Sequence, residues 1–461
     1  MIMLTSAKIA EIVDGELFGS EEILIFSAPE IDSRKCIRGS LFLAFQGENV
    51  DGHDFAEGAI ENGASLVIAN RKIDFPCVVV EDVARALAQI ATYVREVLSE
   101  LVVIGITGSQ GKTTTKDLLA HILSLVGSTI APEGSLNNEL GAPLTLLHCD
   151  DQTRFCIVEM GARHEGDIRN LCSVVKPNIA VALNVGSAHL GEFGSTEAIA
   201  RAKSEIISSL SPEGIAVLGL YDLHTPKFAD GMKVRRITFG QQREADIRAT
   251  DIDIREGRAH FDLVTTEGRA AVALRLVGEH QVPNALAAAA VCTALGISID
   301  VIASGLSTAE ISSHWRMELH ELKDLLLIND AYNANPESAS SALKTLAFFA
   351  QARGGQSWAF LGKMHELGET SSSEHSKVGK VAGALGIDHL VCVGAPEYAL
   401  DGDSFPDTRL HILATKAEAA KLIGFLSPGD VVLVKGSRAE KMEELAKILI
   451  AEWDERVSEE E

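Results

Sequence analysis

Residues 105–115 read GITGSQGKTTT, and this glycine-rich stretch decides the fold of the chain around it. The apolar run LVVI at 101–104 predicts a short buried strand before it, and the apolar spacing at 117–123 predicts a helix after it. A glycine-rich turn between strand and helix directs several backbone N–H groups and the positive helix end at one point, which suits phosphate. The alternative is a tight turn that carries an ordinary surface lysine.

Two side chains of this turn have the chemistry of a nucleotide site. Lys112 would neutralise the outer phosphates, and the Thr113 hydroxyl would ligate Mg²⁺. A strict P-loop has glycine where this chain has Ile106, so the motif is a variant with Gly108 as its first turn glycine. The sequence therefore predicts ATP binding, with phosphate contacts from these residues: Gly108, Ser109, Gln110, Gly111, Lys112, Thr113 and Thr114.

Length and composition set the frame for this site. A chain of 461 residues is too long for one hydrophobic core, so two to four domains are expected. Hydrophobic content of 46% with 39 glycines and few aromatic residues favours alternating α/β layers. A net charge of −24 argues against non-specific binding to nucleic acids or anionic membranes, because both need a basic surface.

The sequence shows no membrane-spanning segment, no signal peptide and no pattern of disulfide-forming cysteines. No apolar run approaches the length of a membrane span, and the acidic N-terminal region does not resemble a signal peptide. The seven cysteines form no CxxC pair, and most lie in apolar surroundings, which predicts buried reduced thiols. We expect a cytoplasmic monomer without membrane insertion or a nucleic-acid partner.

Alternating strand and helix patterns divide the chain into three α/β domains, 1–98, 99–311 and 312–461. The central domain has a P-loop and a parallel, helix-covered sheet, and the last has a Rossmann-like rhythm without its glycine-rich phosphate loop. Residues 246–276 predict antiparallel strands, and residues 83–97 and an alanine-rich segment opening at Pro283 predict helices. Further strands are predicted at 40–45, 65–69, 77–80, 155–159, 179–183, 325–328, 357–361, 389–393 and 431–434.

Polar residues that follow predicted strands are the next candidates. Glu159 ends a buried strand, where α/β sheets bind ligands, so it is a good Mg²⁺ ligand, although it could instead pair with a lysine. His189 also follows a strand and could ligate a second metal ion or be a hydrogen-bonded core residue. Asp330 and Asn333 follow the strand at 325–328, but Asn, Asp and Pro also favour ordinary turns. Lys203 lies in a helical pattern, and by spacing alone it belongs to a solvated face.

Together these motifs resemble the Mur ligases, the ATP-dependent amino-acid ligases of peptidoglycan precursor synthesis. Within that family the chain resembles the type that joins D-alanyl-D-alanine to UDP-N-acetylmuramoyl tripeptide, and the similarity spans nearly the whole sequence. The segment DAYNANP at 330–336 is its most type-specific signature. The other matching segments are DSR at 32–34, GSLF at 39–42, GENVDGHDF at 47–55, LNNELGAP at 136–143, and GEH at 278–280 followed by Asn284.

The resemblance implies roles for particular residues. Glu159, His189 and Lys203 match metal-ligand positions, and the lysine is typically carbamylated by CO₂, so that it becomes a carboxylate ligand. The resemblance implies catalytic roles for Lys112, Lys203 and His189, metal ligands Thr113, Glu159, His189 and Lys203, and nucleotide contacts from Asn284, Arg316 and Asp330. It implies substrate contacts from Ser33, Gln46, Asp51, His53, Asn137, Asn138, Tyr332, Asn333 and Asn335.

The implied reaction consumes ATP, requires two Mg²⁺ ions and the lysine carbamate, and forms an acyl phosphate before the amide. Its partners would be small molecules: ATP, the UDP-linked tripeptide and D-alanyl-D-alanine. Lys363 replaces a family aspartate and Trp315 replaces the usual glycine before Arg316, which puts the roles of those positions in doubt. Three alternatives stay open: a folylpolyglutamate synthase-like ligase of the same superfamily, a P-loop NTPase that couples hydrolysis to switching, and a non-catalytic nucleotide-binding scaffold.

Overall fold

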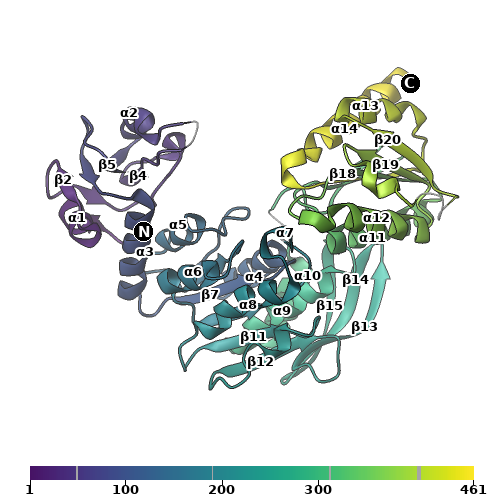
Figure 1. Ribbon diagram of the computed structural model, residues 1–461. Coiled ribbons are helices and arrows are strands. Elements are labelled where there is room, and N and C mark those ends of the chain that lie inside the picture. The colour runs from purple at the N-terminus through teal and green to yellow at the C-terminus, as the bar shows by residue number, and fades with distance from the viewer. Residues whose placement is uncertain (48–49, 189, 311–312, 402–405, 461) are drawn as a thin grey trace.

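The structure is a computed structural model that describes residues 1–47, 50–188, 190–310, 313–401 and 406–460. The described chain forms three α/β units, and Figure 1 shows the first and third units at opposite ends of the central one. Their main sheets have four, nine and six strands, respectively. The α/β class with three units is confirmed. The expected border at 98/99 lies between helix α3 and strand β7, and the border at 311/312 lies outside the described residues.

The first unit has a mixed sheet in the order β2-β6-β5-β4, in which β4, β5 and β6 are parallel and β2 is antiparallel. Its last helix begins after Asp82, whose carboxylate accepts hydrogen bonds from the N–H groups of Ala84 and Arg85 at 2.7 and 3.1 Å. The elements are β1 (Leu4–Thr5), α1 (Ser6–Val13), β2 (Glu16–Phe18), β3 (Leu24–Ile25), β4 (Ser40–Leu43), α2 (Ala56–Glu61), β5 (Ala64–Ala69), β6 (Cys77–Val79) and α3 (Val83–Val97).

Helix α3 joins the first unit to the central one. It packs against helices α5 (Gly141–Leu147) and α6 (Asp167–Val175) of the central unit. Leu87 and Val94 of α3 belong to the same buried apolar cluster as Leu146 of α5. The core of the first unit therefore continues into the central unit.

The central sheet has the order β15-β14-β13-β12-β11-β10-β7-β9-β8. Its strands are parallel from β8 to β13, and β13, β14 and β15 form the predicted antiparallel extension. The strands are β7 (Val102–Thr107), β8 (Thr129–Ile130), β9 (Phe155–Glu159), β10 (Ile179–Ala182), β11 (Ile215–Gly219), β12 (Arg235–Gly240), β13 (Ile247–Arg255), β14 (Arg258–Thr265) and β15 (Gly268–Val277). The remaining helices are α4 (Lys112–Ser124), α7 (Leu190–Phe193), α8 (Thr196–Ser208), α9 (Gln281–Ala294) and α10 (Ile299–Thr308).

The order of the central strands fixes the position of the nucleotide motif. Strand β7 lies between β9 and β10, with Ile106 opposite Glu159 and Thr107 opposite Ala182. The carboxyl ends of these three parallel strands meet at one edge of the sheet. The glycine-rich turn leaves β7 at this edge, where α/β sheets bind ligands.

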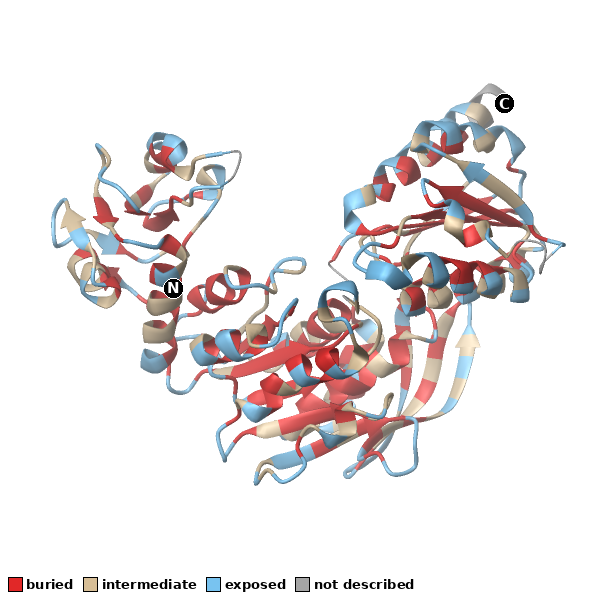
Figure 2. Cartoon of the chain, viewed as in Figure 1, coloured by how far each residue is buried: buried red, intermediate tan, exposed pale blue. Residues whose placement is uncertain are grey.

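The third unit has the strand order β16-β17-β21-β18-β19-β20, with β16 antiparallel and the others parallel. Its buried strands appear as the red core of this unit in Figure 2. The elements are β16 (Glu318–Leu322), β17 (Leu325–Asp330), α11 (Pro336–Arg353), β18 (Ser357–Gly362), α12 (Ser371–Ala384), β19 (His389–Val393), β20 (Arg409–Leu413), α13 (Lys416–Ala420), β21 (Val431–Lys435) and α14 (Met442–Glu460).

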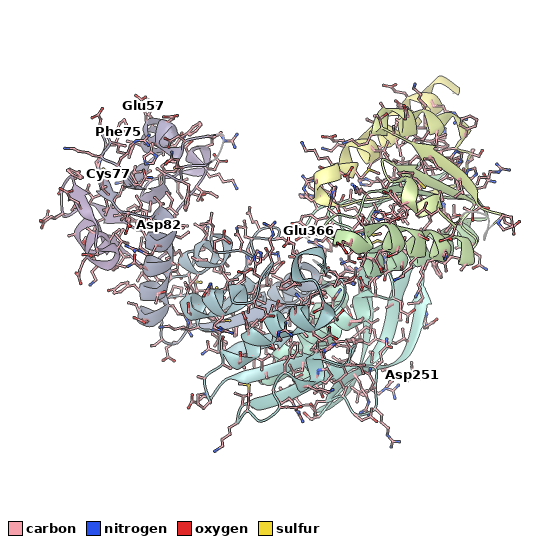
Figure 3. All side chains as sticks on the ribbon, viewed as in Figure 1. Glu57, Phe75, Cys77, Asp82, Asp251 and Glu366 are labelled. Carbon is pink, nitrogen blue, oxygen red and sulfur yellow. The ribbon has the colours of Figure 1, made fainter. Side chains whose placement is uncertain are left out.

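Hydrogen bonds connect the central and third units. The carboxylate of Glu337 accepts hydrogen bonds from the backbone N–H and the hydroxyl of Ser187 at 3.0 and 2.7 Å. The backbone N–H of Gly191 donates to the carbonyl of Glu366 at 2.9 Å, and Figure 3 shows Glu366 between the two units. These contacts hold the third unit near the ligand edge of the central sheet.

The sequence also led to expectations about the cysteines and about membrane-spanning helices. All seven cysteines are buried free thiols, as predicted. In the described part of the chain, no helix has both the length and the apolar character that crossing a membrane requires.

Candidate active site

The glycine-rich turn has the backbone geometry that its sequence predicts. Gly111 adopts φ +81°, and a side chain built on it would place its Cβ 2.2 Å from the Oδ1 of Asn284. The conformation favours glycine at this position, and any larger residue would also displace the Asn284 side chain. Helix α4 begins at the next residue, Lys112, so the free N–H groups of its first turn face the edge of the sheet.

Lys112 curves back over the turn, and its ammonium donates to the carbonyl of Gly108 at 2.8 Å. Burial lowers the pKa of this ammonium below its usual range, the charge of Glu159 opposes the shift, and the nearby guanidinium of Arg316 adds to it. An anion bound at the turn would stabilise the charged form of Lys112. The arrangement thus favours a phosphate group at this point.

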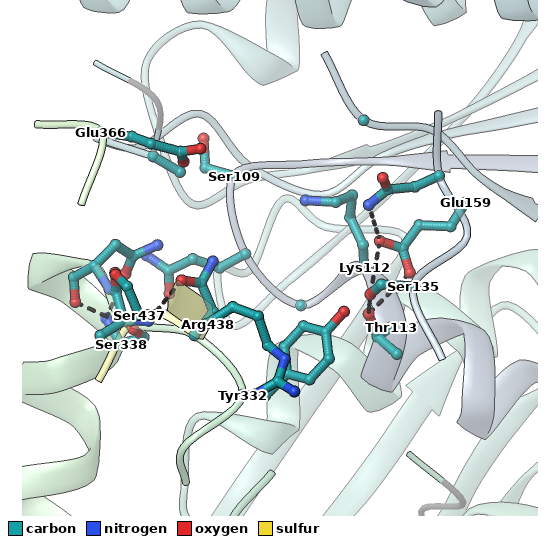
Figure 4. Close-up of a pocket in the computed structure, with 18 of the residues that line it drawn as sticks. Ser109, Lys112, Thr113, Ser135, Glu159, Tyr332, Ser338, Glu366, Ser437 and Arg438 are labelled. Carbon is teal, nitrogen blue, oxygen red and sulfur yellow. Dashed lines mark hydrogen bonds between the residues drawn. The ribbon is translucent and has the colours of Figure 1, made fainter. Parts of the chain in front are cut away.

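A carboxylate and a hydroxyl meet beside the turn. The Glu159 side chain is 1% exposed, and its Oε2 accepts a 2.8 Å hydrogen bond from the Thr113 hydroxyl. Its Oε1 accepts hydrogen bonds from the Asn137 amide at 2.8 Å and the Ser135 hydroxyl at 3.4 Å. Figure 4 shows this cluster with Lys112 beside it. Buried carboxylate and hydroxyl oxygens are the kind of ligands that Mg²⁺ prefers, and here they lie next to the glycine-rich turn.

Lys203 lies on α8 and lines the same cleft. Its side chain is 3% exposed, so the solvated helix face that spacing alone indicates is wrong. Burial, followed by the charge of Lys112, lowers the pKa of Lys203 well below its usual range. Both effects favour the neutral amine, which is the nucleophilic form of the side chain. The other predicted metal ligand, His189, lies outside the described residues.

The third unit supplies the opposite wall. The Arg316 guanidinium lies 4.0 Å from the centre of the Tyr332 ring and donates to the hydroxyls of Thr113 and Ser135 at 2.9 and 3.3 Å. Figure 4 shows Tyr332 and Arg438 across from Lys112 and Glu159. Arg316 therefore connects the third unit to Thr113, directly after the glycine-rich turn (called the phosphate turn below).

Asp330 and Asn333 are positioned by a buried lysine. The Lys435 ammonium donates to the Asp330 carboxylate at 2.5 Å and to the Asn333 carbonyl at 2.9 Å. Lys435 is the last residue of β21, which pairs with β17, so the ion pair joins two neighbouring strand ends. This sheet edge faces the central unit.

One cleft of about 1140 Å³ brings most of the predicted residues together. Gly108 is not among its lining residues but bonds to Lys112 through its carbonyl. The predicted residues that line the cleft are Ser109, Gln110, Gly111, Lys112, Thr113, Thr114, Asn137, Asn138, Glu159, Lys203, Asn284, Arg316, Asp330, Tyr332, Asn333 and Asn335. Some of these also support local structure: Asn335 caps α11, and Asn138 accepts from the N–H of Gly141 at 3.0 Å.

The four predicted residues of the first unit do not line this cleft. Asp51 accepts hydrogen bonds from Arg71 at 2.7 Å and from the Nδ1 of His53 at 2.6 Å, and these bonds, that from Arg71 first, lower the pKa of its carboxyl. His53 in turn accepts a hydrogen bond from the Asn70 N–H through Nε2 at 3.3 Å, so its neutral ring carries the proton on Nδ1. Gln46 forms a bridge with Asp51, and Ser33 begins a short 3₁₀ helix.

Sequence reasoning missed four residues that shape the cleft or its walls. Ser135 contacts both Thr113 and Glu159, and it directly precedes the motif at 136–143 that sequence reasoning singled out. Asn184 holds the turn by accepting from the N–H groups of Ser109 and Gln110 at 3.1 Å each. Lys435 and Lys116 are buried lysines, and the spacing of hydrophobic residues alone does not reveal that a lysine lies in the core.

The structure shows the surroundings of the two residues that depart from the family pattern. Trp315 adopts φ +58°, a left-handed conformation that suits glycine, and the guanidinium of Arg438 lies 4.5 Å from the centre of its ring. The carbonyl of Lys363 accepts a hydrogen bond from the N–H of Ser437 at 3.1 Å.

Family models match three consecutive parts of the chain. The Mur ligase family, catalytic domain model covers residues 28–102, the Mur ligase middle domain covers 106–292, and the Mur ligase, glutamate ligase domain covers 315–438. Their order follows the three α/β units along the chain.

Known proteins resemble the chain over nearly its full length. It is 38% identical to the UDP-N-acetylmuramoyl-tripeptide--D-alanyl-D-alanine ligase of Mycobacterium tuberculosis over 502 residues, which cover 98% of each protein. The crystal structure of MurF from Acinetobacter baumannii has a TM-score of 0.87 and 36% identity, covering 97% of this chain and 99% of that one. The MurF ligase from Thermotoga maritima in complex with ADP has a TM-score of 0.79 and 31% identity, covering 93% and 98%. The chain therefore belongs to the Mur ligase family, and within it to the MurF type.

Proposed function

We propose that this protein is an ATP-dependent ligase that joins D-alanyl-D-alanine to UDP-N-acetylmuramoyl tripeptide and so makes the UDP-linked pentapeptide precursor of peptidoglycan. The observation that carries this proposal is one cleft in which the glycine-rich turn, Glu159 and Lys203 face Arg316 and Asp330 of the third unit. Such a cleft can align a nucleotide from one unit with an acceptor from another. A relative that matches 98% of the chain bears the name of this activity.

ATP would bind with its phosphates at the N-terminus of α4, beside Lys112. Asn284 and Asp330 would contact the nucleoside, and Arg316 would approach the phosphates from the third unit. Closure of the two units around the nucleotide would exclude water from the reacting groups.

Mg²⁺ fits the oxygen donors found beside the turn. Thr113, Glu159, His189 and a carbamylated Lys203 would hold two ions, which would screen the charge of the triphosphate from the substrate carboxylate. The described part of the chain, which does not include His189, has no group of three or more His, Cys, Asp or Glu side chains that could hold a metal ion.

Lys203 has the properties that carbamate formation needs. Its neutral amine would attack the carbon of CO₂, and loss of one N–H proton would leave an anionic carbamate. This change replaces a buried amine, whose protonated form the Lys112 charge disfavours, by a carboxylate, which the Lys112 charge stabilises. Incubation with ¹³C-bicarbonate should give a carbamate carbon signal in the NMR spectrum, and Lys203→Ala should abolish that signal.

The proposed chemistry has two steps. An oxygen of the terminal tripeptide carboxylate attacks the γ-phosphorus of ATP, and ADP leaves as the acyl phosphate forms. The amine of D-alanyl-D-alanine then attacks the acyl carbon, loses a proton, and expels phosphate to give the amide. Lys112 would hold the outer phosphates, and alignment of the reactants in the cleft would contribute about 7–11 kcal/mol to the rate enhancement.

The remaining substrate contacts follow from the three-unit arrangement. Ser33, Gln46, Asp51 and His53 of domain 1–98 would bind the UDP-linked end of the tripeptide. Asn137 and Asn138 of domain 99–311 would face its peptide end. Tyr332, Asn333 and Asn335 of domain 312–461 would contact the incoming dipeptide, and the protein would act as a monomer.

The test is release of ADP by the purified protein with Mg²⁺-ATP and the tripeptide substrate, with and without D-alanyl-D-alanine. We expect release that depends on both substrates, with a pentapeptide product identified by mass. ADP release that depends on neither substrate would instead indicate a general NTPase. ADP release that requires a folate and glutamate would indicate a folylpolyglutamate synthase.

A further inference from the structure

Lys116 is a buried lysine that the proposed reaction does not use. It lies on α4, one turn beyond Lys112, and is 1% exposed. Its ammonium donates to the carbonyls of Pro132 and Gly134 at 2.7 and 3.2 Å, and it forms an ion pair with Asp117 at 2.8 Å. The three acceptors match the three N–H donors of a lysine, so this cation is fully paired.

The two carbonyls belong to residues 131–138, which form most of the connection from β8 to α5 and have no regular secondary structure. Ser135 directly follows Gly134, and its hydroxyl bonds to the Thr113 hydroxyl at 2.7 Å and to the Glu159 carboxylate at 3.4 Å. Asn137 of the same segment donates to that carboxylate at 2.8 Å. The segment therefore provides two of the three hydrogen bonds that orient Glu159, and the Thr113 hydroxyl provides the other.

We propose that Lys116 is a positioning residue that fixes segment 131–138 and thereby orients the Glu159 carboxylate for a divalent cation. The inference rests on the proposed Mg²⁺-ATP site. A flexible loop that supplies hydrogen bonds to a metal ligand must be held, because the ligand otherwise loses its fixed orientation. Here helix α4 carries the lysine that holds segment 131–138. The same helix therefore positions both the glycine-rich turn at its N-terminus and the proposed metal ligand Glu159.

Binding of Mn²⁺ in the presence of ADP tests this role without requiring ligase activity. In Lys116→Met we expect the Mn²⁺ dissociation constant, measured by electron paramagnetic resonance of the free ion, to rise about tenfold or more. Binding of ADP in EDTA should change less than twofold, because the phosphate turn is intact. A folded Lys116→Met protein with the wild-type Mn²⁺ constant would overturn the proposal.

Two further variants keep the test decisive. Arg95→Met is the matched control: Arg95 is 8% exposed and donates to the carbonyls of Val175 and Leu98. None of these three residues lines the cleft, so the loss of Arg95 should lower the melting temperature but leave the Mn²⁺ constant unchanged. If Lys116→Met does not fold, Ser135→Ala decides, and an unchanged Mn²⁺ constant in that variant would overturn the proposal. A wild-type protein that binds no Mn²⁺ with ADP would overturn the metal site as well, whereas a variant equal to wild type overturns only the role of Lys116.

Discussion

Gly111→Ala should damage nucleotide binding by an amount that the structure allows us to calculate. Alanine in the left-handed conformation of Gly111, at φ +81°, costs about 1–2 kcal/mol. The new Cβ would also lie 2.2 Å from the Oδ1 of Asn284, whose amide donates to Gln281 at 2.8 Å. Moving Asn284 away breaks this hydrogen bond and costs about 1 kcal/mol more.

Without a ligand, the turn of the variant relaxes to another conformation, and ADP binding must restore the original one. The total of about 2–3 kcal/mol then corresponds to a loss of roughly 30- to 150-fold in ADP affinity. Isothermal titration with Mg²⁺-ADP measures this loss, and urea unfolding measures any part that appears as lower stability. The control is Gly231→Ala, where φ is +77° and nothing lies within 4 Å of the added Cβ, so only the conformational cost remains and ADP affinity should not change. A Gly111→Ala protein with wild-type ADP affinity and wild-type stability would refute the reasoning.

Three other predictions concern the third unit. Asp330→Asn should lower the free energy of unfolding by about 3–5 kcal/mol, because the buried Lys435 loses its anion, and a wild-type melting temperature would contradict this. Burial, with the nearby charge of His411, lowers the pKa of His389 to about 4, so the neutral ring stabilises the fold above pH 6.5 and this contribution is lost as the pH falls toward 4. After a discount for solvent screening, the free energy of unfolding in urea should fall by about 1–2 kcal/mol between pH 6.5 and pH 4. The His389→Gln variant should lose less stability over this pH range than the wild type. Trp315→Gly should be more stable than Trp315→Ala by about 1 kcal/mol, because φ is +58° and only glycine adopts it freely; equal unfolding midpoints for the two variants would contradict this.

Much of the fold could be predicted because buried parallel strands form continuous apolar runs. The strands β9, β19 and β21 and the helix α3 occur where the sequence predicts them. The helix expected to open at Pro283 begins two residues earlier, at Gln281, because proline is tolerated in the first turn, where N–H groups have no helical partner. The position of β7 between β9 and β10 could not be predicted, because apolar runs do not reveal which strands are neighbours.

The candidate site was predictable where a motif carries its own geometry. Glu159 lies at the strand end that its sequence indicates, next to the phosphate turn. Lys203 was not predictable from its helical pattern, because the side of α8 that carries it faces the cleft rather than solvent. Ser135 and Lys116 act through contacts between distant segments, which no local pattern encodes.

The residues of the first unit show a different limit. Asp51 and His53 lie in a motif typical of substrate binding, and the structure shows them bonded to each other and to Arg71. Their contact with the UDP-linked substrate stays a prediction.

An oxygen-transfer experiment tests the central claim most directly. The UDP-linked tripeptide is labelled with ¹⁸O in its terminal carboxylate and allowed to react with Mg²⁺-ATP and D-alanyl-D-alanine, and the released phosphate is analysed by mass spectrometry. An acyl phosphate passes one labelled oxygen from the carboxylate to phosphate, so we predict one ¹⁸O in each phosphate released. Phosphate without the label would contradict the account, because its fourth oxygen would then have come from water.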